Sequence, residues 1–341
     1  MRTKSFPDII QGGMGVGVSL WPLARAVSLL GGIGVISGTL VEVVVARTLQ
    51  MGDPCGYIRW ALAPFHFPIK EVAERVIAKY YIPGGKAPGA RFKDVPLFGM
   101  NPEKSLTDLI IVSNFAQVFL AKEGHQGLVG INLLEKVQLP TICALYGAML
   151  AGVDCVFIGA GIPKQIPRVL DNLSRHDYAA YKIGVEGAVI GDDFRQCFDP
   201  KAFLNGRKLP RLRRPGFLPI VSAPSIIKRF FMDEPEMIQG FSGELPPAGG
   251  HNAPPRGEKR FNERRRTCLW GTRRHRLGGL HFSRSPFLGW RRVCFSGETC
   301  RGASSRRAGN SGGKYFCALQ RVGDERTPKS IDKKNGVSWG A

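Results

Sequence analysis

Residues 7–39 read PDIIQGGMGVGVSLWPLARAVSLLGGIGVISGT, and this stretch decides the fold class of the chain. Two short apolar runs, at residues 9–11 and 33–37, are each followed by glycine. The segment between them has helical periodicity. Strand, helix and strand within about 30 residues are typical of a parallel crossover unit. Because α/β folds bind ligands at the carboxyl ends of their strands, we expect a ligand site beside the glycines after residue 11.

The helix between these runs has start and stop signals. Ser19 is expected to be its N-cap, and Pro22 suits the first turn, where a proline loses no helical hydrogen bond. Gly31 and Gly32 are expected to end it. The face that packs on the sheet is expected to hold the apolar side chains of Leu23, Ala26, Val27 and Leu30.

Apolar periodicity predicts that strands and helices alternate along the rest of the chain. Helices are expected at residues 40–48, 69–81, 105–122, 140–152, 166–173 and 226–231, and strands at 154–161, 218–222 and 237–244. Residues 128–138 are expected to form a further strand and its exit. Residues 53–64 are expected to form a loop, and residues 181–217 are interpreted as an inserted segment. This order of elements indicates an α/β fold with a parallel sheet.

Composition restricts the class of protein. The chain has 341 residues, 43% of them apolar, which is enough for one large barrel. It has no apolar run long enough to span a membrane, and its first residues lack the apolar core of a signal peptide. Its eight cysteines form no C-x-x-C pair, which favours reduced thiols, no metal site and a cytoplasmic location.

The formal net charge of +21 is unevenly distributed. Residues 265–341 hold 17 of the 48 Lys and Arg residues but only four of the 27 Asp and Glu residues. Basic clusters in this tail have neither interleaved aromatic residues nor an amphipathic period. We therefore expect no nucleic-acid partner and no membrane partner.

Polar residues stand where predicted strands end. Asn132 lies inside an apolar strand, where its burial is costly unless neighbouring backbone or a ligand bonds it. Lys136 follows that strand and is either a solvated lysine or a cation beside a ligand. Ser222 stands at the mouth of the strand predicted at 218–222.

The most specific motif is AGGHNAPPRG at residues 248–257. Its two glycines, Gly249 and Gly250, let the backbone approach a flat ring closely. His251 then follows a strand end, where a histidine can take or orient a proton near neutral pH. The alternative is a histidine with a purely structural role.

The glycines of residues 13–17 have the wrong spacing for G-x-G-x-x-G, and no acidic residue follows about 20 positions later. They form either a tight turn or a ligand loop. Taken with the later motifs, residues 7–264 closely resemble the nitronate monooxygenase (2-nitropropane dioxygenase) family. The resemblance implies a (β/α)8 TIM barrel that binds FMN.

Carried over residue by residue, the resemblance implies FMN contacts at Gly13, Met14, Asn132, Lys136, Ser222, Glu244, Gly249 and Gly250. It implies that His251 faces the substrate beside the flavin. One departure is the sequence FSGEL at residues 241–245, where the family has a β-branched run before Glu-Gly. This departure weakens the strand.

The resemblance stops at residue 265. The family has two further strands that end in glycine-rich loops, which hold the flavin phosphate. Neither loop is present in residues 265–341 as written. If the first base of each codon is dropped, permitted codons for residues 309–321 spell GIQVGNTFALCN, and residues 288–298 can spell LAGGGFASPE. We interpret residues 265–341 as an out-of-frame, irregular and disordered tail that replaces the last two β/α units.

The activity implied by the resemblance is oxidation of alkyl nitronates by O2 to a carbonyl compound and nitrite, with FMN as cofactor. Loss of the phosphate loops implies low or no activity for this chain. The alternatives are a flavin-dependent enoyl-thioester reductase of the same barrel group, which needs a reduced nicotinamide donor, and a non-catalytic degraded gene product. The sequence leaves the oligomeric state open.

Overall fold

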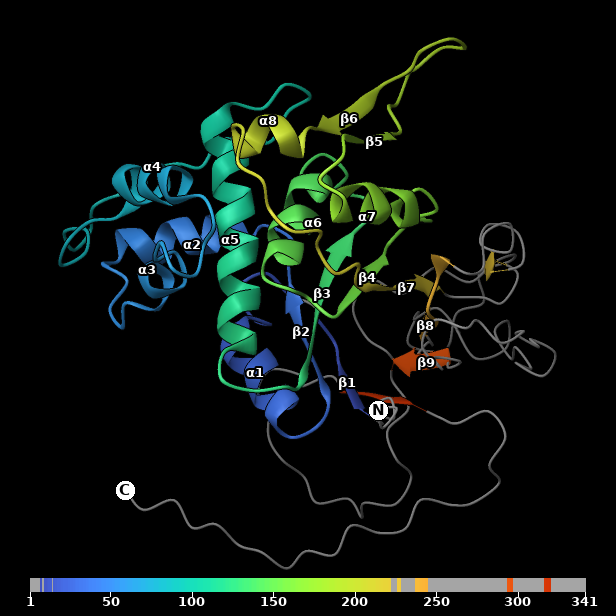
Figure 1. Ribbon diagram of the computed structural model, residues 1–341, viewed down its shortest axis with the longest axis horizontal. Coiled ribbons are helices and arrows are strands. Elements are labelled where there is room, and N and C mark those ends of the chain that lie inside the picture. The colour runs from blue at the N-terminus through green and yellow to red at the C-terminus, as the bar shows by residue number, and fades with distance from the viewer. Residues whose placement is uncertain are drawn as a thin grey trace, which may run out of the picture.

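The computed structural model describes residues 7, 9–13, 15–221, 226–227, 237–244, 293–296 and 316–319. Its centre is a curled sheet of parallel strands (Figure 1). In spatial order these are β1 (Ile9–Gln11), β2 (Ile33–Ser37), β3 (Leu128–Leu134), β4 (Cys155–Gly159), β7 (Gly216–Val221) and β8 (Phe241–Glu244). A mixed α/β fold with a curled parallel sheet, as expected from the sequence, is confirmed.

Two short strands from the last quarter of the chain stand between β8 and β1. β9 (Val293–Ser296) pairs in parallel with β8, whereas β10 (Phe316–Leu319) is antiparallel to both β9 and β1. A (β/α)8 barrel has parallel strands throughout, so β10 departs from the expected pattern. The sequence predicted only irregular chain here, and the rest of residues 265–341 lies outside the described part.

Most predicted helices are confirmed to within a few residues. They are α1 (Trp21–Leu29), α2 (Val41–Gln50), α4 (Lys70–Tyr80), α5 (Lys104–Lys122), α6 (Thr141–Leu150) and α7 (Ile166–Ser174). The helix predicted at 226–231 falls largely outside the described residues. In the part of the chain that is described, no helix is both long and apolar enough to cross a bilayer.

Helix α3 (Tyr57–Ala61) lies in the segment predicted to be a loop. The carboxylate of Asp53 accepts hydrogen bonds from the backbone N–H groups of Ile58, at 3.2 Å, and Arg59, at 3.0 Å. An aspartate that binds the first N–H groups of a helix stabilises its amino end. A helix of this length has too few turns for apolar periodicity, which is why the sequence pattern missed it.

Helix α5 is buried along most of its length, between the sheet and the outer helices α2, α3 and α4 (Figure 1). It is apolar on nearly all sides, as expected for a helix that contacts protein all round. Its buried Asp108 is 1% exposed and accepts a hydrogen bond from Arg75 at 2.7 Å. A buried charge of this kind requires such a partner.

The strand register decides which side chains face the barrel interior. One interior layer consists of residues that are partners across β2, β3, β4 and β7, namely Ser37, Asn132, Phe157 and Leu218. Side chains alternate along a strand, so the residues next to them face outward and pack against the helices, as Ile36, Ile131 and Val156 do. The polar members of the layer, Ser37 and Asn132, therefore point into the barrel.

The predicted N-cap of α1 is wrong, and of the four residues predicted on its packed face only Val27 is buried, whereas Ala26 is exposed. The N-cap is Leu20, and the Ser19 hydroxyl instead donates to the Val35 carbonyl at 2.7 Å. The buried residues are Ala24, Val27 and Ser28, whereas Leu23 and Leu30 are exposed. Small residues fix this orientation, because a Cβ at Gly34 would lie 1.8 Å from the Ala24 carbonyl oxygen. Pro22 in the first turn is confirmed.

Residues 179–204, in the segment interpreted as an insertion, form a separate antiparallel hairpin and a short helix. The strands are β5 (Ala179–Lys182) and β6 (Arg195–Phe198), and helix α8 (Pro200–Leu204) follows directly. The Asp199 carboxylate caps α8 by accepting a hydrogen bond from the Lys201 N–H at 2.9 Å. Figure 1 shows the hairpin projecting away from the body of the molecule.

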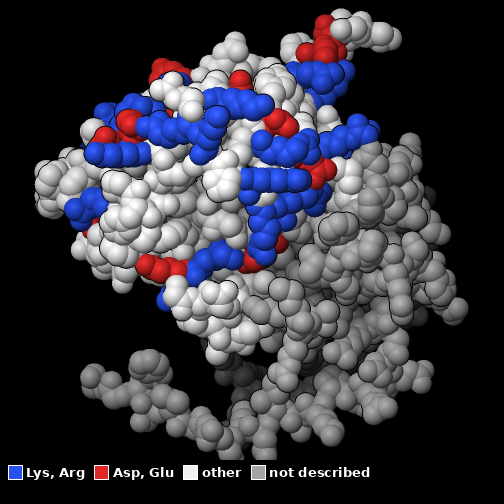
Figure 2. Space-filling model, in the orientation of Figure 1, with Lys and Arg blue, Asp and Glu red and all other residues white. Residues whose placement is uncertain are grey.

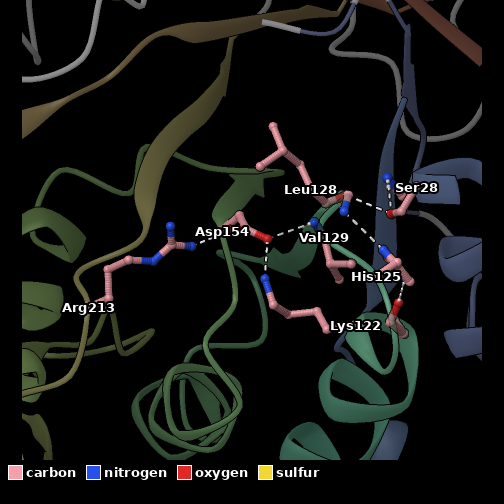
Figure 3. Close-up of polar contacts among 10 residues, drawn as sticks. Ser28, Lys122, His125, Leu128, Val129, Asp154 and Arg213 are labelled. Carbon is pink, nitrogen blue, oxygen red and sulfur yellow. Dashed lines mark hydrogen bonds and ion pairs between the residues drawn. The ribbon is translucent and has the colours of Figure 1, made fainter. Parts of the chain in front are cut away.

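A polar network ties together the amino ends of the central strands. The Asp154 carboxylate accepts hydrogen bonds from the Val129 N–H at 2.9 Å, the Lys122 ammonium at 2.5 Å, and Arg213 (Figure 3). Nearby, the Ser28 hydroxyl donates to the Leu128 carbonyl at 2.6 Å. These contacts join the beginnings of β3, β4 and β7 to α5 and α1. The amino end of a barrel is the end at which such contacts serve stability.

Replacing Asp154 by Ala is expected to lower the free energy of unfolding by about 2–4 kcal/mol, because a buried N–H loses its acceptor and two cations lose their counter-charge. Asp177→Ala is the matched control, since Asp177 also lies between two cations but is exposed. Its loss is expected to change stability little. Urea unfolding followed by circular dichroism measures both. Equal losses for the two variants would contradict this account.

Candidate functional site

The carboxyl ends of the parallel strands form the candidate site. Ser37 ends β2 and is paired in register with Asn132 of β3. Both side chains are buried, and Phe157 of β4 continues the same interior layer. Ser242 of β8 is also buried and is the partner of Ile220 on β7. Buried polar groups within an apolar interior, at this end of a parallel sheet, are typical of a ligand site.

The Gln11 side chain joins the first two strands below this layer. Its amide nitrogen donates to the Val35 carbonyl at 3.1 Å, and its amide oxygen accepts the Val35 N–H at 3.1 Å. The Ser19 hydroxyl accepts a further hydrogen bond from Gln11. The Ser37 N–H then donates to the Ser19 carbonyl at 2.8 Å. These bonds fix the loop after β1 relative to the end of β2.

Gly13 lies directly against the interior layer. A Cβ atom at Gly13 would be 2.4 Å from the Val35 Cγ1 and 2.9 Å from the Asn132 Cβ. No side chain fits in that space, so glycine is required for the loop to close over the strand ends. The structure thus brings together two of the predicted FMN-contacting residues, Gly13 and Asn132. The reason for the glycine is the close contact of the loop with Val35 and Asn132.

Lys136 is exposed in the turn after β3. The neighbouring residue Glu135 is partly buried. The backbone N–H of Glu135 donates to the Gly159 carbonyl at 2.8 Å, and this hydrogen bond joins the exits of β3 and β4. A Cβ at Gly161 would lie 2.5 Å from the Glu135 Cγ. The two exit loops are therefore packed against each other beside the interior layer.

Two carboxyl groups near this end of the sheet have raised pKa values. Burial raises the pKa of Glu42, in the first turn of α2, and a backbone hydrogen bond opposes that rise. Burial also raises the pKa of Glu135, and a hydrogen bond from Gln138 opposes it. Acids with raised pKa values near strand ends are candidates for functional groups. Neither residue was predicted from the sequence to be functional, although each follows a predicted strand closely.

The other predicted site residues lie at the limit of the described part of the chain. Glu244 is the last residue of β8, and its backbone is paired with Ser296 of β9. Met14, Ser222, Gly249, Gly250 and His251 lie outside the described residues. Within the described ranges, no group of three or more His, Cys, Asp or Glu side chains is placed to hold a metal ion.

No protein-family model matches the chain, and no curated protein sequence matches it. A function for the chain is therefore inferred from the geometry of the strand ends and from the sequence motifs.

Gly13→Ala is expected to lower the free energy of unfolding by about 1–3 kcal/mol, because the added methyl group overlaps Val35 and Asn132. Gly99→Ala is the control, since no atom lies within 4 Å of a Cβ there. Adding Val35→Ala to Gly13→Ala is expected to recover part of the loss, which a double-mutant cycle measures by chemical unfolding. A cycle with no coupling between residues 13 and 35 would contradict the contact.

Glu42→Gln is expected to stabilise the protein near neutral pH and to have little effect at low pH. The pKa of Glu42 is higher in the folded protein than in the unfolded chain, so ionisation of Glu42 lowers the free energy of unfolding. This loss begins as pH rises above the pKa of the unfolded chain and is complete above the pKa of the folded protein. A glutamine carries no charge and avoids that loss. Urea unfolding at about pH 4 and about pH 7 measures the change. Glu74→Gln, at an exposed site on α4, is the control, and an equal gain there would contradict the burial argument.

Proposed function

We propose that the carboxyl ends of the curled sheet form a flavin site, and that the chain is an FMN-dependent oxidoreductase of the nitronate monooxygenase type. The observation that carries this proposal is the contact between Gly13 and Asn132. The loop after the first strand packs closely against the Cβ of the buried Asn132 at the strand ends. The sequence resemblance implies FMN contacts at both of these residues.

The polar groups of the interior layer suit a flavin ring. The Asn132 carboxamide offers both a donor and an acceptor, and so does the Ser37 hydroxyl. The pyrimidine edge of an isoalloxazine presents both kinds of group in return. Phe157 and Leu218 supply apolar surface in the same layer. A mostly apolar lining with a few polar groups is typical of cofactor sites.

Bound FMN supplies the redox chemistry by which O2 converts an alkyl nitronate into a carbonyl compound and nitrite. The residues of the chain bind and orient the reactants. In this proposal Asn132 holds the polar edge of the ring, and Lys136 places a cation at the exposed rim of the site. His251 orients the nitronate or takes its proton.

The proposal includes a one-base shift near codon 264, so the present chain has a defective phosphate site. Barrels of this type hold a cofactor phosphate with the loops after their last two strands. The antiparallel direction of β10 puts its amino end, and not its carboxyl end, at the candidate site. Loss of three charge-assisted hydrogen bonds, each worth about 1.5–3 kcal/mol, lowers FMN affinity by on the order of a thousandfold or more.

The test compares this chain with one whose gene carries a one-base correction near codon 264. The corrected chain is expected to bind FMN on the order of a thousandfold more tightly, measured by quenching of flavin fluorescence. It is expected to release nitrite from a nitronate in the presence of O2. Asn132→Ala in the corrected chain is expected to weaken FMN binding about tenfold, whereas Asn101→Ala, at an exposed site, is expected to leave it unchanged.

Three results would contradict the proposal. The first is a gene whose nucleotide sequence reads in one intact frame that matches close relatives through residue 341. The second is a folded corrected chain that does not bind FMN. The third is flavin that a reduced nicotinamide bleaches without nitronate turnover, which would favour the enoyl-thioester reductase alternative.

A further inference from the structure

Helix α1 has an apolar flank that is open to water. Leu23 and Leu30 are 40% and 88% exposed, and Ala26 is exposed as well. At 3.6 residues per turn, Leu23 and Leu30 lie one above the other, with Ala26 beside them. These are three of the four residues whose spacing predicts a buried face, and the fourth, Val27, is buried. An apolar stripe at helical spacing indicates a packing neighbour on that side.

The opposite flank of α1 packs against α5. The Trp21 N–H donates to the Gln117 amide oxygen at 2.9 Å, and the Arg25 guanidinium donates to the Leu120 carbonyl at 3.5 Å. Trp21 and Arg25 are four residues apart and therefore share one flank. Leu23 and Leu30 lie on the side of the helix that is turned away from α5.

The outer surface of β1 is open on the same side. Ile10 packs in the barrel interior, so its neighbour Ile9 faces outward. Ile9 is 47% exposed, whereas the outward-facing Ile36 of β2 and Ile131 of β3 are completely buried. Ile9 is paired with Ala318 of β10. None of the described helices therefore covers the seam between β1 and β10.

We call Ile9, Leu23, Ala26 and Leu30 the α1 patch, and its chemistry restricts what can bind there. It contains no charged or polar side chain. Figure 2 shows charged side chains across the middle of this face of the molecule, whereas the lower edge, where Figure 1 places α1, is largely uncharged. An uncharged apolar surface associates with another apolar surface, because removal from water drives the association.

The order of the elements indicates which surface this is. Helix α1 follows β1 and contacts β2, and α5 follows β2 and contacts β3. Each of these helices thus covers the sheet between the strand before it and the strand after it. By the same rule, the position over the seam beside β1 belongs to a helix that follows the last strand of the ring.

The shifted reading of residues 309–321 supplies such an element. It spells GIQVGNTFALCN, which is a short apolar run, a turn containing glycine and asparagine, and then a threonine followed by apolar residues. This order is typical of a strand, a turn and the capped start of a helix.

We propose that the α1 patch is the docking surface of the last helix of the ring, which the shifted frame encodes after this strand. The helix is encoded only if the one-base shift of the proposed function is correct, whereas FMN binding is not required. In the present chain the patch contacts water. In the corrected chain the helix buries it, which stabilises the fold.

The test introduces Leu30→Glu into the present chain and into the chain with the one-base correction. Urea unfolding followed by circular dichroism is expected to show a midpoint lowered by about 0.5 M or more in the corrected chain and by about 0.1 M or less in the present chain. Leu29→Glu is the matched control, because Leu29 is also exposed at the end of α1 but lies on the side of Arg25. It is expected to shift the two midpoints equally and only slightly.

Sedimentation velocity of the corrected chain is expected to give the same oligomeric state with and without Leu30→Glu. A corrected chain that does not fold, or equal shifts of the two midpoints by Leu30→Glu, would overturn the proposal. A corrected dimer that Leu30→Glu dissociates would also overturn it, since the patch would then bind a second copy. A folded corrected chain that shows the Leu30 effect but binds no FMN would contradict the flavin site and support the docking of the helix.

Discussion

The carboxamide of Gln11 connects β1 to β2, and the arrangement of the candidate site depends on this connection. Among the described residues, one backbone pair joins these two strands in register, Ile10 with Ile33. Beyond it, the Gln11 side chain takes both the N–H and the carbonyl of Val35. It gives the buried Val35 N–H an acceptor and shares the Val35 carbonyl with the Ser19 hydroxyl, and a buried N–H without an acceptor is costly. It also frees the chain after β1 to turn over the strand ends, where Gly13 meets Asn132.

The two ends of the curled sheet have different kinds of polar group. At the amino ends, Asp154 is surrounded by donors from α5, β3 and the segment before β7, so its charge is neutralised by the chain itself. At the carboxyl ends, Ser37, Asn132 and Ser242 are uncharged and buried, and the acids nearby have raised pKa values. The first set stabilises the fold, and the second offers groups to a ligand.

The tail alters the site through strand direction. A parallel strand in the position of β10 would send its following loop to the carboxyl ends of the sheet, where a cofactor phosphate is held in barrels of this type. The antiparallel pairing of β10 with β1 and β9 reverses that exit. Of the two strands described in residues 265–341, β9 therefore continues the parallel direction of the sheet and β10 reverses it.

The sequence by itself determined the alternation of strands and helices, because periods of two and of about 3.6 residues record which faces are buried. The helices at 70–80 and 104–122 were predictable for that reason, and so was the polar residue Asn132 within an apolar strand. Only the tertiary structure decided that Ser19 binds Val35 instead of capping α1, and that Ala24 rather than Leu23 faces the sheet. It also decided that Gly13 is needed beside Val35 and Asn132. These features depend on distances between segments far apart in sequence, and no local pattern records such distances.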